Sequence, residues 1–401
     1  MKLKEFEAKK LIQAVGIPTS EGILITSSDQ ILFFSQEKVF KLQTIVNGRG
    51  KAGGILAVKT ADEAKSLAVK FLGKKFLDET IKEVLLDEKI VIVKEIYLGI
   101  TFDTSKRAPV LIIGPGGVDA EELPKQIQLI NQDLTWDISK LSLEFISLYL
   151  PNKKVQNEFE EIVDKLRKCF GRFDCKMIEI NPLVLASDNN LIAVDAIAVL
   201  DDDASFRREI SFPPRTNNRE ATSREIAARE IDKDDYRGVA GKTFIDLDGD
   251  IGILTSGGGA SMTLMDALLK YGGKPANFTE YSGNPPQEKV EKLTRIVLDK
   301  ENLSGLLVAG VIANFTNIAE TLKGVLTVIE EKKPNFPIVI RRAGPHDDEA
   351  KKMIEEVRER CGLSIYYFDE NTPLTKSAEI MVDLSNKYKN KFNGREQRIT
   401  A

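Results

Sequence analysis

The sequence has little cysteine, no excess of positive charge and no long apolar segment. Its three cysteines, Cys169, Cys175 and Cys361, form neither a Cys-x-x-Cys pair nor an even set, which suits a reducing cytosol and predicts buried small side chains. The net charge of −4 argues against a general nucleic-acid-binding protein, which is normally basic. No apolar run approaches the ~18 residues that span a bilayer, and the N-terminal stretch lacks the apolar segment of a signal peptide. We therefore expect a cytoplasmic protein.

What is present is the composition of an ordinary globular chain, with 42% hydrophobic and 29% charged residues. The length of 401 residues exceeds what one hydrophobic core usually serves and predicts two or three domains. A polar, charged and proline-initiated stretch at 213–237 has the composition of a linker containing a short helix. The last residues, 391–401, show no core pattern and are predicted to be disordered.

The stretch from Gly249 to Gly283 organises the second half of the chain. It reads as a buried strand at 250–255, a turn of three glycines at 257–259 and a helix from 260 to 271. Such a junction brings unpaired backbone N–H groups and the positive end of a helix dipole to one point, which suits a phosphate or a carboxylate. Many α/β proteins connect strand to helix this way for packing alone, so both interpretations stay open.

From about residue 238 onward, strand and helix patterns alternate. This predicts a doubly wound parallel sheet, whose ligand sites lie at the carboxyl ends of the strands. Polar residues follow three of the predicted strands, at 256–261, 313–317 and 341–346. We therefore expect a binding site where these three ends meet.

The first half contains a basic loop rich in glycine, between Lys41 and Gly54. Its glycines let the backbone fold closely over a polyanion, and Lys41 and Arg49 supply neutralising charge. The alternative is a mobile basic hairpin tip without a ligand.

A second hairpin brings two oxygen-bearing side chains together. Asn181 and Asp195 lie on segments expected to pair as antiparallel strands around a turn at 187–190. An amide and a carboxylate suit Mg²⁺, which binds few protein oxygens together with nucleotide phosphates. In isolation, Asn181-Pro182 would more often simply start a turn.

Taken together, these motifs resemble a known family. GRGKAGG at 48–54, KEIYLG at 94–99, EINPLV at 179–184 with Asp195, and GGGAS at 257–261 are similar to the ATP-grasp subunit of acyl-CoA synthetases, best known as the succinyl-CoA synthetase β subunit. The resemblance implies a mixed α/β and α+β fold. An N-terminal ATP-grasp domain at 1–212 would precede the linker and a flavodoxin-like, doubly wound CoA-ligase domain at 238–390.

The resemblance also implies roles for individual residues. The nucleotide phosphates of ATP would be held by Lys41, Gly48, Arg49 and Gly50. Glu95 would face the adenine, Asn181 and Asp195 would bind Mg²⁺, and Glu179 would lie where a phosphohistidine enters. Asp87 stands where the family has a glutamate that touches the ribose, and Asn47 and Pro115 replace usual residues of the two phosphate-side loops. We expect these departures to affect nucleotide preference rather than binding itself.

Three strings in the second half indicate the acid. NFTEYSG at 277–283, IANFTN at 312–317 and RRAGP at 341–345 resemble ATP-citrate lyase and citryl-CoA synthetase rather than succinate-specific subunits. Citrate carries three carboxylates and a hydroxyl and needs more donors than succinate. Arg342 would clamp one carboxylate, and Asn314 and Thr316 would bind a carboxylate and the hydroxyl. Another carboxylate would lie at the helix start, on the N–H groups of Gly258, Gly259, Ala260 and Ser261. The alternative for Arg341 and Arg342 is a surface ion pair.

The only histidine, His346, follows RRAGP, where the family has no phosphoryl acceptor. We interpret it as a cap or surface residue, so the phosphohistidine and most of the CoA site would belong to a smaller partner subunit in a hetero-oligomer. These features predict the large subunit of citryl-CoA synthetase. The basic glycine loop and the linker favour the synthetase over ATP-citrate lyase. A succinate–CoA ligase, or a nucleotide-sensing or scaffold subunit without turnover, are the alternatives.

Overall fold

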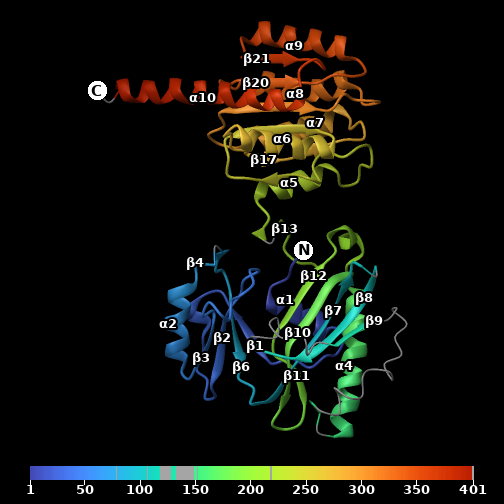
Figure 1. The fold of residues 1–401 in the computed structure, drawn as a ribbon. Coiled ribbons are helices and arrows are strands. Elements are labelled where there is room, and N and C mark those ends of the chain that lie inside the picture. The colour runs from blue at the N-terminus through green and yellow to red at the C-terminus, as the bar shows by residue number, and fades with distance from the viewer. Residues whose placement is uncertain are drawn as a thin grey trace. The chain divides into compact units, whose positions relative to one another are not determined.

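The chain divides into two compact units, Met1–Glu220 and Ala221–Ala401, which are described here one at a time (Figure 1). The computed structural model describes residues 1–77, 79–105, 107–117, 128–131, 149–150, 152–216 and 219–399. The division falls inside the stretch 213–237 that the sequence predicts as a linker. Within the described residues, no helix has the length and apolar character needed to cross a membrane.

The first unit contains a small antiparallel sheet of four strands in the order β1-β6-β2-β3. These strands are β1 (Gly22–Ile25), β2 (Lys38–Leu42), β3 (Ile55–Val58) and β6 (Val84–Glu88). Helix α2 (Ala61–Phe71) begins at Thr60, whose side chain accepts from the Glu63 N–H, and packs its alanines against the sheet. Short elements complete this part: η1 (Ser28–Gln30), β4 (Lys75–Phe76) and β5 (Glu79–Thr80).

A larger antiparallel sheet forms the rest of the first unit. Its order is β11-β10-β7-β8-β9, and β12 also pairs with β10. The strands are β7 (Ile92–Asp103), β8 (Ala108–Pro115), β9 (Gln128–Asn131), β10 (Cys175–Ala186), β11 (Leu191–Ala193) and β12 (Ala196–Leu200). Helices α1 (Glu5–Gln13) and α4 (Lys153–Arg172) share one hydrophobic core with this sheet. The unit also contains η4 (Asp202–Arg207), β13 (Arg215–Thr216) and β14 (Arg219–Glu220). Cys169 and Cys175 are buried as expected, and Cys361 of the second unit is half-buried.

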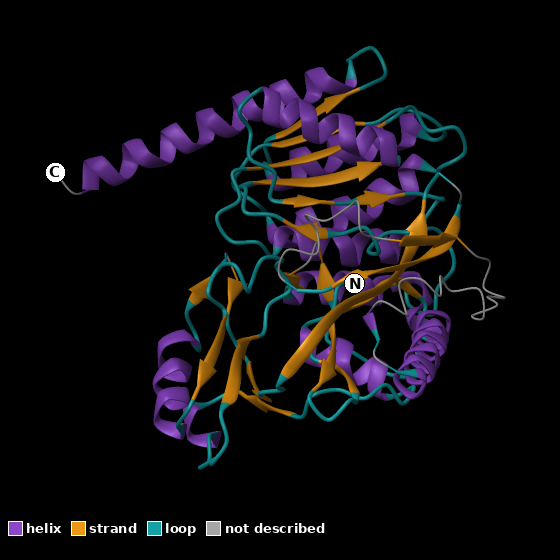
Figure 2. Ribbon diagram, turned by 60° about the horizontal axis from the view of Figure 1, so that its bottom comes forward, coloured by secondary structure: helices purple, strands orange, loops and turns teal. Residues whose placement is uncertain are grey.

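The second unit is built on a five-stranded parallel sheet in the order β18-β16-β19-β20-β21 (Figure 2). Its strands are β16 (Ile251–Ser256), β18 (Glu280–Tyr281), β19 (Gly305–Gly310), β20 (Ile338–Arg341) and β21 (Ile365–Phe368). A separate two-stranded pair is β15 (Ile245–Asp246) with β17 (Asn277–Phe278). The helices are α5 (Ser223–Ile231), α6 (Gly258–Lys270), α7 (Gln287–Leu298), α8 (Ile318–Lys332), α9 (Asp347–Cys361) and α10 (Leu374–Ile399).

Helices cover both faces of this sheet, so the predicted doubly wound arrangement is confirmed. Along β19, Leu306 and Val308 pack in the core formed with α7, α8 and α9. Leu307 and Ala309 point the other way, into the core formed with α6 and α10. This alternation explains why the strand is apolar at every position.

The C-terminal segment differs from the prediction, because α10 continues to Ile399 where the sequence predicts disorder from 391 onward. Ala378 and Met381 anchor the earlier turns of the helix in the core. The residues that follow contain one glycine and no proline, and adding turns to an existing helix is far easier than starting one.

Candidate functional site

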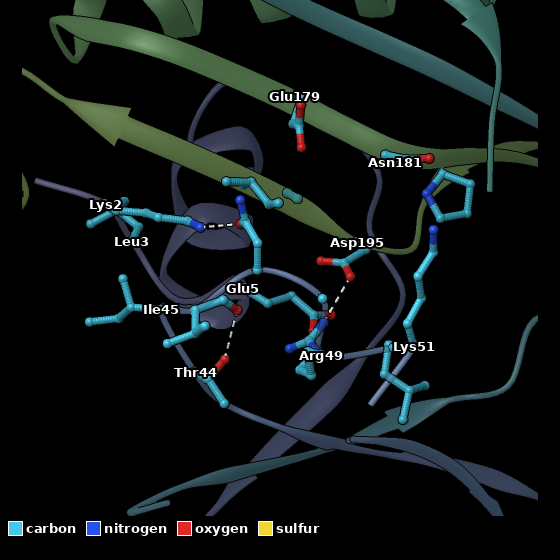
Figure 3. Close-up of a pocket in the computed structure, with 18 of the residues that line it drawn as sticks. Lys2, Leu3, Glu5, Thr44, Ile45, Arg49, Lys51, Glu179, Asn181 and Asp195 are labelled. Carbon is cyan, nitrogen blue, oxygen red and sulfur yellow. Dashed lines mark hydrogen bonds and ion pairs between the residues drawn. The ribbon is translucent and has the colours of Figure 1, made fainter. Parts of the chain in front are cut away.

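The first unit contains a cavity of about 300 Å³ between the loop that joins β2 to β3 and the strands β10 and β12 (Figure 3). Most of the residues that the resemblance assigns to the nucleotide, its metal and the entering phosphohistidine border this space. They are Gly48, Arg49, Gly50, Glu95, Glu179, Asn181 and Asp195.

Asn181 and Asp195 come opposite one another, as predicted. The Asn181 N–H donates to the Asp195 carbonyl at 3.2 Å, between the strand pairings Ile180–Ala196 and Leu183–Ala193. The buried Asp195 Oδ1 has no hydrogen-bond partner among the described residues, and Asn181 Oδ1 accepts only the Gly117 N–H, at 3.0 Å. Two available oxygens fit a Mg²⁺ ion that takes its other ligands from phosphates and water.

The glycine-rich loop forms a tight turn at the cavity wall. The Ala52 N–H donates to the Gly48 carbonyl at 3.0 Å, and the Gly54 N–H donates to the Arg49 carbonyl at 2.9 Å. Gly48 has a φ of +81°, which favours glycine. A Cβ at Gly54 would lie 2.7 Å from Arg49 Cγ, so a larger residue at this position would clash with the Arg49 side chain. The exposed Lys51 also borders the cavity.

Arg49 is held by two carboxylates in this structure. Its Nη2 lies 2.8 Å from Asp195 Oδ2 and 2.7 Å from Glu5 Oε2. Its Nη1 donates to the Leu42 carbonyl at 2.9 Å. Burial alone would lower the pKa of the guanidinium, but Asp195 and Glu5 raise it, so Arg49 remains cationic. Any anion that binds Arg49 therefore has to compete with Asp195 and Glu5 for this group.

Lys41 and Asp87 are buried and are not among the residues that line the cavity. Lys41 Nζ lies 2.7 Å from Glu5 Oε1, 2.7 Å from Asp87 Oδ2 and 2.8 Å from the Val194 carbonyl, which uses all its donors. Asp87 is fully buried and also accepts from Lys9 Nζ at 2.7 Å and from the Ser20 hydroxyl at 2.9 Å. In this structure Asp87 therefore fixes the position of the Lys41 ammonium group.

The carboxylates of this network differ in their electrostatics. Burial raises the pKa of Asp195 to about 6, and the Glu5 charge adds to this effect, whereas Arg49 and Lys41 oppose it. Burial also acts to raise the pKa of Glu5, but Lys41, Arg49 and Lys9 outweigh it and hold that pKa well below its usual range. Glu5 is therefore the firmly ionised member, and Asp195 is the one whose charge is least stabilised.

Glu95 and Glu179 lie at two other parts of the wall. The Glu95 carbonyl accepts the Gly116 N–H at 3.0 Å, and a Cβ at Gly117 would lie 2.4 Å from Glu95 Oε2. Glu95 also borders a second hollow, together with Pro115 and Tyr149. Glu179 Oε2 accepts a hydrogen bond from the Tyr97 hydroxyl at 2.6 Å. Because Gly117 has no side chain, the Glu95 carboxylate can lie directly against it.

Glu5 is not among the site residues predicted from the sequence, although it lines the cavity. Glu5 and Lys9 are buried and ion-paired at 3.3 Å, one helical turn apart. They lie on the same face as the buried Ile12. A charged pair on an apolar helix face was the signal that could have revealed them.

The second unit brings the predicted acid-binding groups to one end of its sheet. Helix α6 starts at Gly258 after Gly257, whose φ is +94°. The N–H groups of Gly258, Gly259 and Ala260 belong to the first turn and have no carbonyl partner within the helix. Ser261 is different, because its N–H donates to the Gly257 carbonyl at 2.9 Å and its buried hydroxyl also bonds there, at 3.0 Å. Three of the four predicted backbone donors therefore remain.

Arg341 and Arg342 do not form a surface ion pair, because both are buried. Arg341 donates to the backbone carbonyls of Gly310 and Thr372 at 2.8 and 2.9 Å. Arg342 is fully buried, and its three guanidinium nitrogens have no hydrogen-bond partner among the described residues. Arg341 therefore has a structural role, whereas the Arg342 guanidinium is buried without a hydrogen-bond partner among the described residues.

Gly310 sets the direction of the Arg342 side chain. A Cβ at Gly310 would lie 2.2 Å from Arg342 Nη1 and 2.8 Å from the Ser256 carbonyl oxygen, so the guanidinium crosses β19 toward the end of β16. Ser256 directly precedes Gly257 and the start of α6. Arg342 and the first turn of α6 therefore lie at the same end of the sheet.

Asn314 and Thr316 lie in the segment 311–317 between β19 and α8. The Ala313 N–H donates to the Ala343 carbonyl at 2.8 Å, which holds this segment beside the residue after Arg342. Asn314 is exposed and Thr316 is buried. His346 lies at the N-cap of α9 with an exposed side chain, 3.7 Å from Glu349, in agreement with a surface role.

Comparisons with known proteins divide the chain in the same way. Residues 2–185 match the family model described as ATP-grasp domain, and residues 219–384 match the one described as ATP citrate lyase citrate-binding. The succinate–CoA ligase [ADP-forming] subunit beta of Staphylothermus marinus is 31% identical over 398 residues, which cover 96% of this chain and 100% of that protein. The Methanocaldococcus jannaschii protein of the same name is 32% identical over 366 residues, covering 89% and 94%.

Solved structures with the same fold carry a different name. The ATP citrate lyase from Methanothrix soehngenii, in complex with citrate and coenzyme A, matches with a TM-score of 0.78 at 23% identity, covering 95% of this chain and 99% of that one. The Methanosaeta concilii ATP citrate lyase in complex with (3S)-citryl-CoA gives a TM-score of 0.74 at 22% identity, covering 94% and 97%. At these identities the likeness is one of fold.

Proposed function

We propose that this chain, which belongs to the family of succinate–CoA ligase β subunits, is the large subunit of an ATP-dependent ligase that joins citrate to coenzyme A. Membership of this family supports the reaction class, which is the ADP-forming ligation of an acid to coenzyme A. The choice of citrate as the acid rests on the second unit, and above all on Arg342.

The observation that carries the proposal is the buried, unpaired guanidinium of Arg342. A buried charge without a partner is costly, so it persists where a function requires it. A carboxylate would supply the missing partner through a bidentate, charge-assisted pair. The free N–H groups at the start of α6 lie at the same sheet end and suit a second carboxylate.

Succinate also has two carboxylates, so further groups favour citrate. Asn314 and Thr316 add side-chain donors on the segment 311–317, which a backbone hydrogen bond holds to Ala343, and these donors match the third carboxylate and the hydroxyl of citrate. The agreement of residues 219–384 with a citrate-binding family model supports the same choice. The names of the curated relatives favour succinate, which is the principal rival.

In the first unit, the cavity residues fit a nucleotide with its metal. Asn181 and Asp195 would bind Mg²⁺, which when present neutralises the charge on the phosphoryl group being transferred. Gly48 and Gly50 allow the backbone to approach the phosphates closely, and Arg49 would exchange its carboxylate partners for them. Glu95, beside the second hollow, would bind the adenine.

The phosphoryl relay requires a histidine from another chain. His346 lies in the second unit at the start of α9 and is far along the chain from the cavity residues, so we assign the phosphohistidine and most of the CoA site to a smaller partner subunit. ATP would phosphorylate that imidazole beside Glu179. The phosphoryl group would then pass to a citrate carboxylate, and the CoA thiol would displace phosphate to give citryl-CoA.

The experiment is to purify the chain with its partner subunit and identify the products from citrate, ATP, Mg²⁺ and coenzyme A. We expect ADP, phosphate and accumulating citryl-CoA, as for citryl-CoA synthetase. Acetyl-CoA with oxaloacetate would instead identify a subunit of ATP-citrate lyase. Binding of ATP without turnover of any dicarboxylate or tricarboxylate would indicate a nucleotide-sensing or scaffold subunit.

A further inference from the structure

A second unpaired polar group lies beside Arg342. The Tyr281 side chain is fully buried, and its hydroxyl has no hydrogen-bond partner among the described residues. The Arg342 guanidinium carbon lies 5.9 Å from the centre of the Tyr281 ring. Buried polar groups in proteins are nearly always hydrogen-bonded, so two unpaired groups in contact need an explanation.

The sheet places these groups in one row. Tyr281 pairs with Ser256 across β18 and β16, and Ser256 pairs with Gly310 across β16 and β19. Arg341 pairs with Ala309, so Arg342 comes next to Gly310. Residues in register on a parallel sheet point to the same face. Because Gly310 has no side chain, the Arg342 guanidinium crosses it toward the Tyr281 ring.

We propose that Tyr281 is a further substrate-binding residue, whose hydroxyl donates a hydrogen bond to the same carboxylate that Arg342 binds. This inference rests on the proposed function, because it assumes that Arg342 binds the acid. A carboxylate has two oxygens and accepts the guanidinium and the hydroxyl together. The two residues would then select an acid whose carboxylate enters deeply, between the ring of Tyr281 and Gly310.

The chemistry of Tyr281 agrees with a donor role. Burial raises the pKa of its hydroxyl, while the charge of Arg342 opposes this effect, so the group stays protonated at neutral pH and can donate. A tyrosine used only for packing gains nothing from a buried, unpaired hydroxyl, because phenylalanine fills almost the same volume without that cost.

Neither group is exposed in the free protein, so a carboxylate has to enter past a neighbouring segment. The segment 311–317 is held beside Ala343 by the Ala313 N–H, and Val311, Ile312 and Phe315 within it are largely exposed. Because these apolar side chains are not packed in the core, moving this segment would cost few buried contacts.

The test is the binding of citrate to the full-length chain by calorimetry, with Tyr281→Phe and the matched control Tyr367→Phe. The Tyr367 hydroxyl donates to the Arg342 carbonyl at 3.1 Å, so this tyrosine also contacts Arg342 but its hydroxyl is already paired. We expect Tyr281→Phe to raise the Kd for citrate about 10- to 100-fold, as for loss of a hydrogen bond to a charged group, without lowering the thermal midpoint. Tyr367→Phe should lower the midpoint and leave Kd within about twofold.

The other possible results distinguish an error in the role of Tyr281 from an error in the proposed function. If wild type binds citrate and Tyr281→Phe binds it equally well, the role of Tyr281 is wrong and the proposed function stands. If wild type binds succinate but not citrate, the proposed function itself is wrong. Tricarballylate, which is citrate without its hydroxyl, should lose the same factor in Tyr281→Phe. A loss confined to citrate would assign Tyr281 to the substrate hydroxyl and overturn the carboxylate contact.

Discussion

Arg49 Nη2 lies 2.8 Å from Asp195 Oδ2, so the cation expected to hold a nucleotide phosphate is paired with the carboxylate expected to hold its metal. Glu5 Oε2 contacts the same nitrogen at 2.7 Å. Binding of a metal–nucleotide complex would replace this internal pair with two external ones, from Arg49 to phosphate and from Asp195 to Mg²⁺. The charges of Arg49 and Asp195 therefore balance one another in this structure, and Glu5, which also lines the cavity, is firmly ionised.

Changing Glu5 to Gln should destabilise the first unit strongly. Glu5 contacts Lys9, Lys41 and Arg49. Its loss leaves these three cations sharing two carboxylates, those of Asp87 and Asp195. We expect a loss of about 3–5 kcal/mol in the free energy of unfolding, measured by urea titration. Glu37→Gln is the control, because Glu37 pairs with Lys89 at 2.6 Å on the surface and its removal should hardly move the midpoint. Equal effects of the two changes would contradict the network described here.

Asn181→Ala should abolish turnover by removing one of the two oxygens proposed for Mg²⁺. We expect activity to fall at least about 100-fold, and the Mg²⁺ concentration for half-maximal ATP binding to rise. Asn190→Ala is a matched control, since Asn190 lies on the same hairpin with its side chain exposed and bonded to Asp188. Unchanged activity of Asn181→Ala would refute the metal assignment.

Arg342→Gln should separate function from stability. The change removes an unpaired buried charge, so the free energy of unfolding should stay level or rise, while citrate binding weakens by about 100-fold or more. Arg341→Gln should do the opposite, because Arg341 bonds to the carbonyls of Gly310 and Thr372. Calorimetry with citrate and urea unfolding of both variants provide the measurements. A large loss of stability in Arg342→Gln with normal citrate binding would make Arg342 a structural residue.

The lowered pKa of Asp87 predicts how the stability of the fold depends on pH. Burial acts to raise the pKa of its carboxyl, but Lys41 and Lys9 outweigh burial and lower it. A carboxyl whose folded pKa lies below its unfolded value contributes stability above the unfolded value of about 4, and that contribution is lost as the pH falls through the folded pKa. Asp87→Asn should therefore cost about 3–5 kcal/mol at pH 7 and progressively less below pH 4. A cost that does not change with pH would contradict this account.

The sequence predicts those parts of the site that local pattern determines. Asn181 and Asp195 flank one hairpin, so strand pairing alone brings them together. Arg342 follows a buried strand of a parallel sheet, so its place at the carboxyl edge follows from the alternation of strands and helices. The glycine turn before α6 is predicted for the same reason.

What could not be predicted depends on pairing over long distances. The resemblance assigns Lys41 and Asp87 to the nucleotide, yet Lys41 pairs with both Asp87 and Glu5, and Glu5 comes from helix α1, 36 residues earlier in the chain. The contact between Tyr281 and Arg342 depends on strand order, which places β18 next to β16 rather than next to β19. Ser261 was assigned as a donor because the sequence does not fix whether the helix starts at Gly258 or Ala260.

The most direct test of the central claim is the ratio of kcat/KM for citrate to kcat/KM for succinate. It should be measured on the chain purified with its partner subunit, at saturating ATP, Mg²⁺ and coenzyme A. The unpaired Arg342 and its neighbouring donors predict a preference for citrate of about 100-fold or more. Equal use of the two acids, or a preference for succinate, would contradict the assignment.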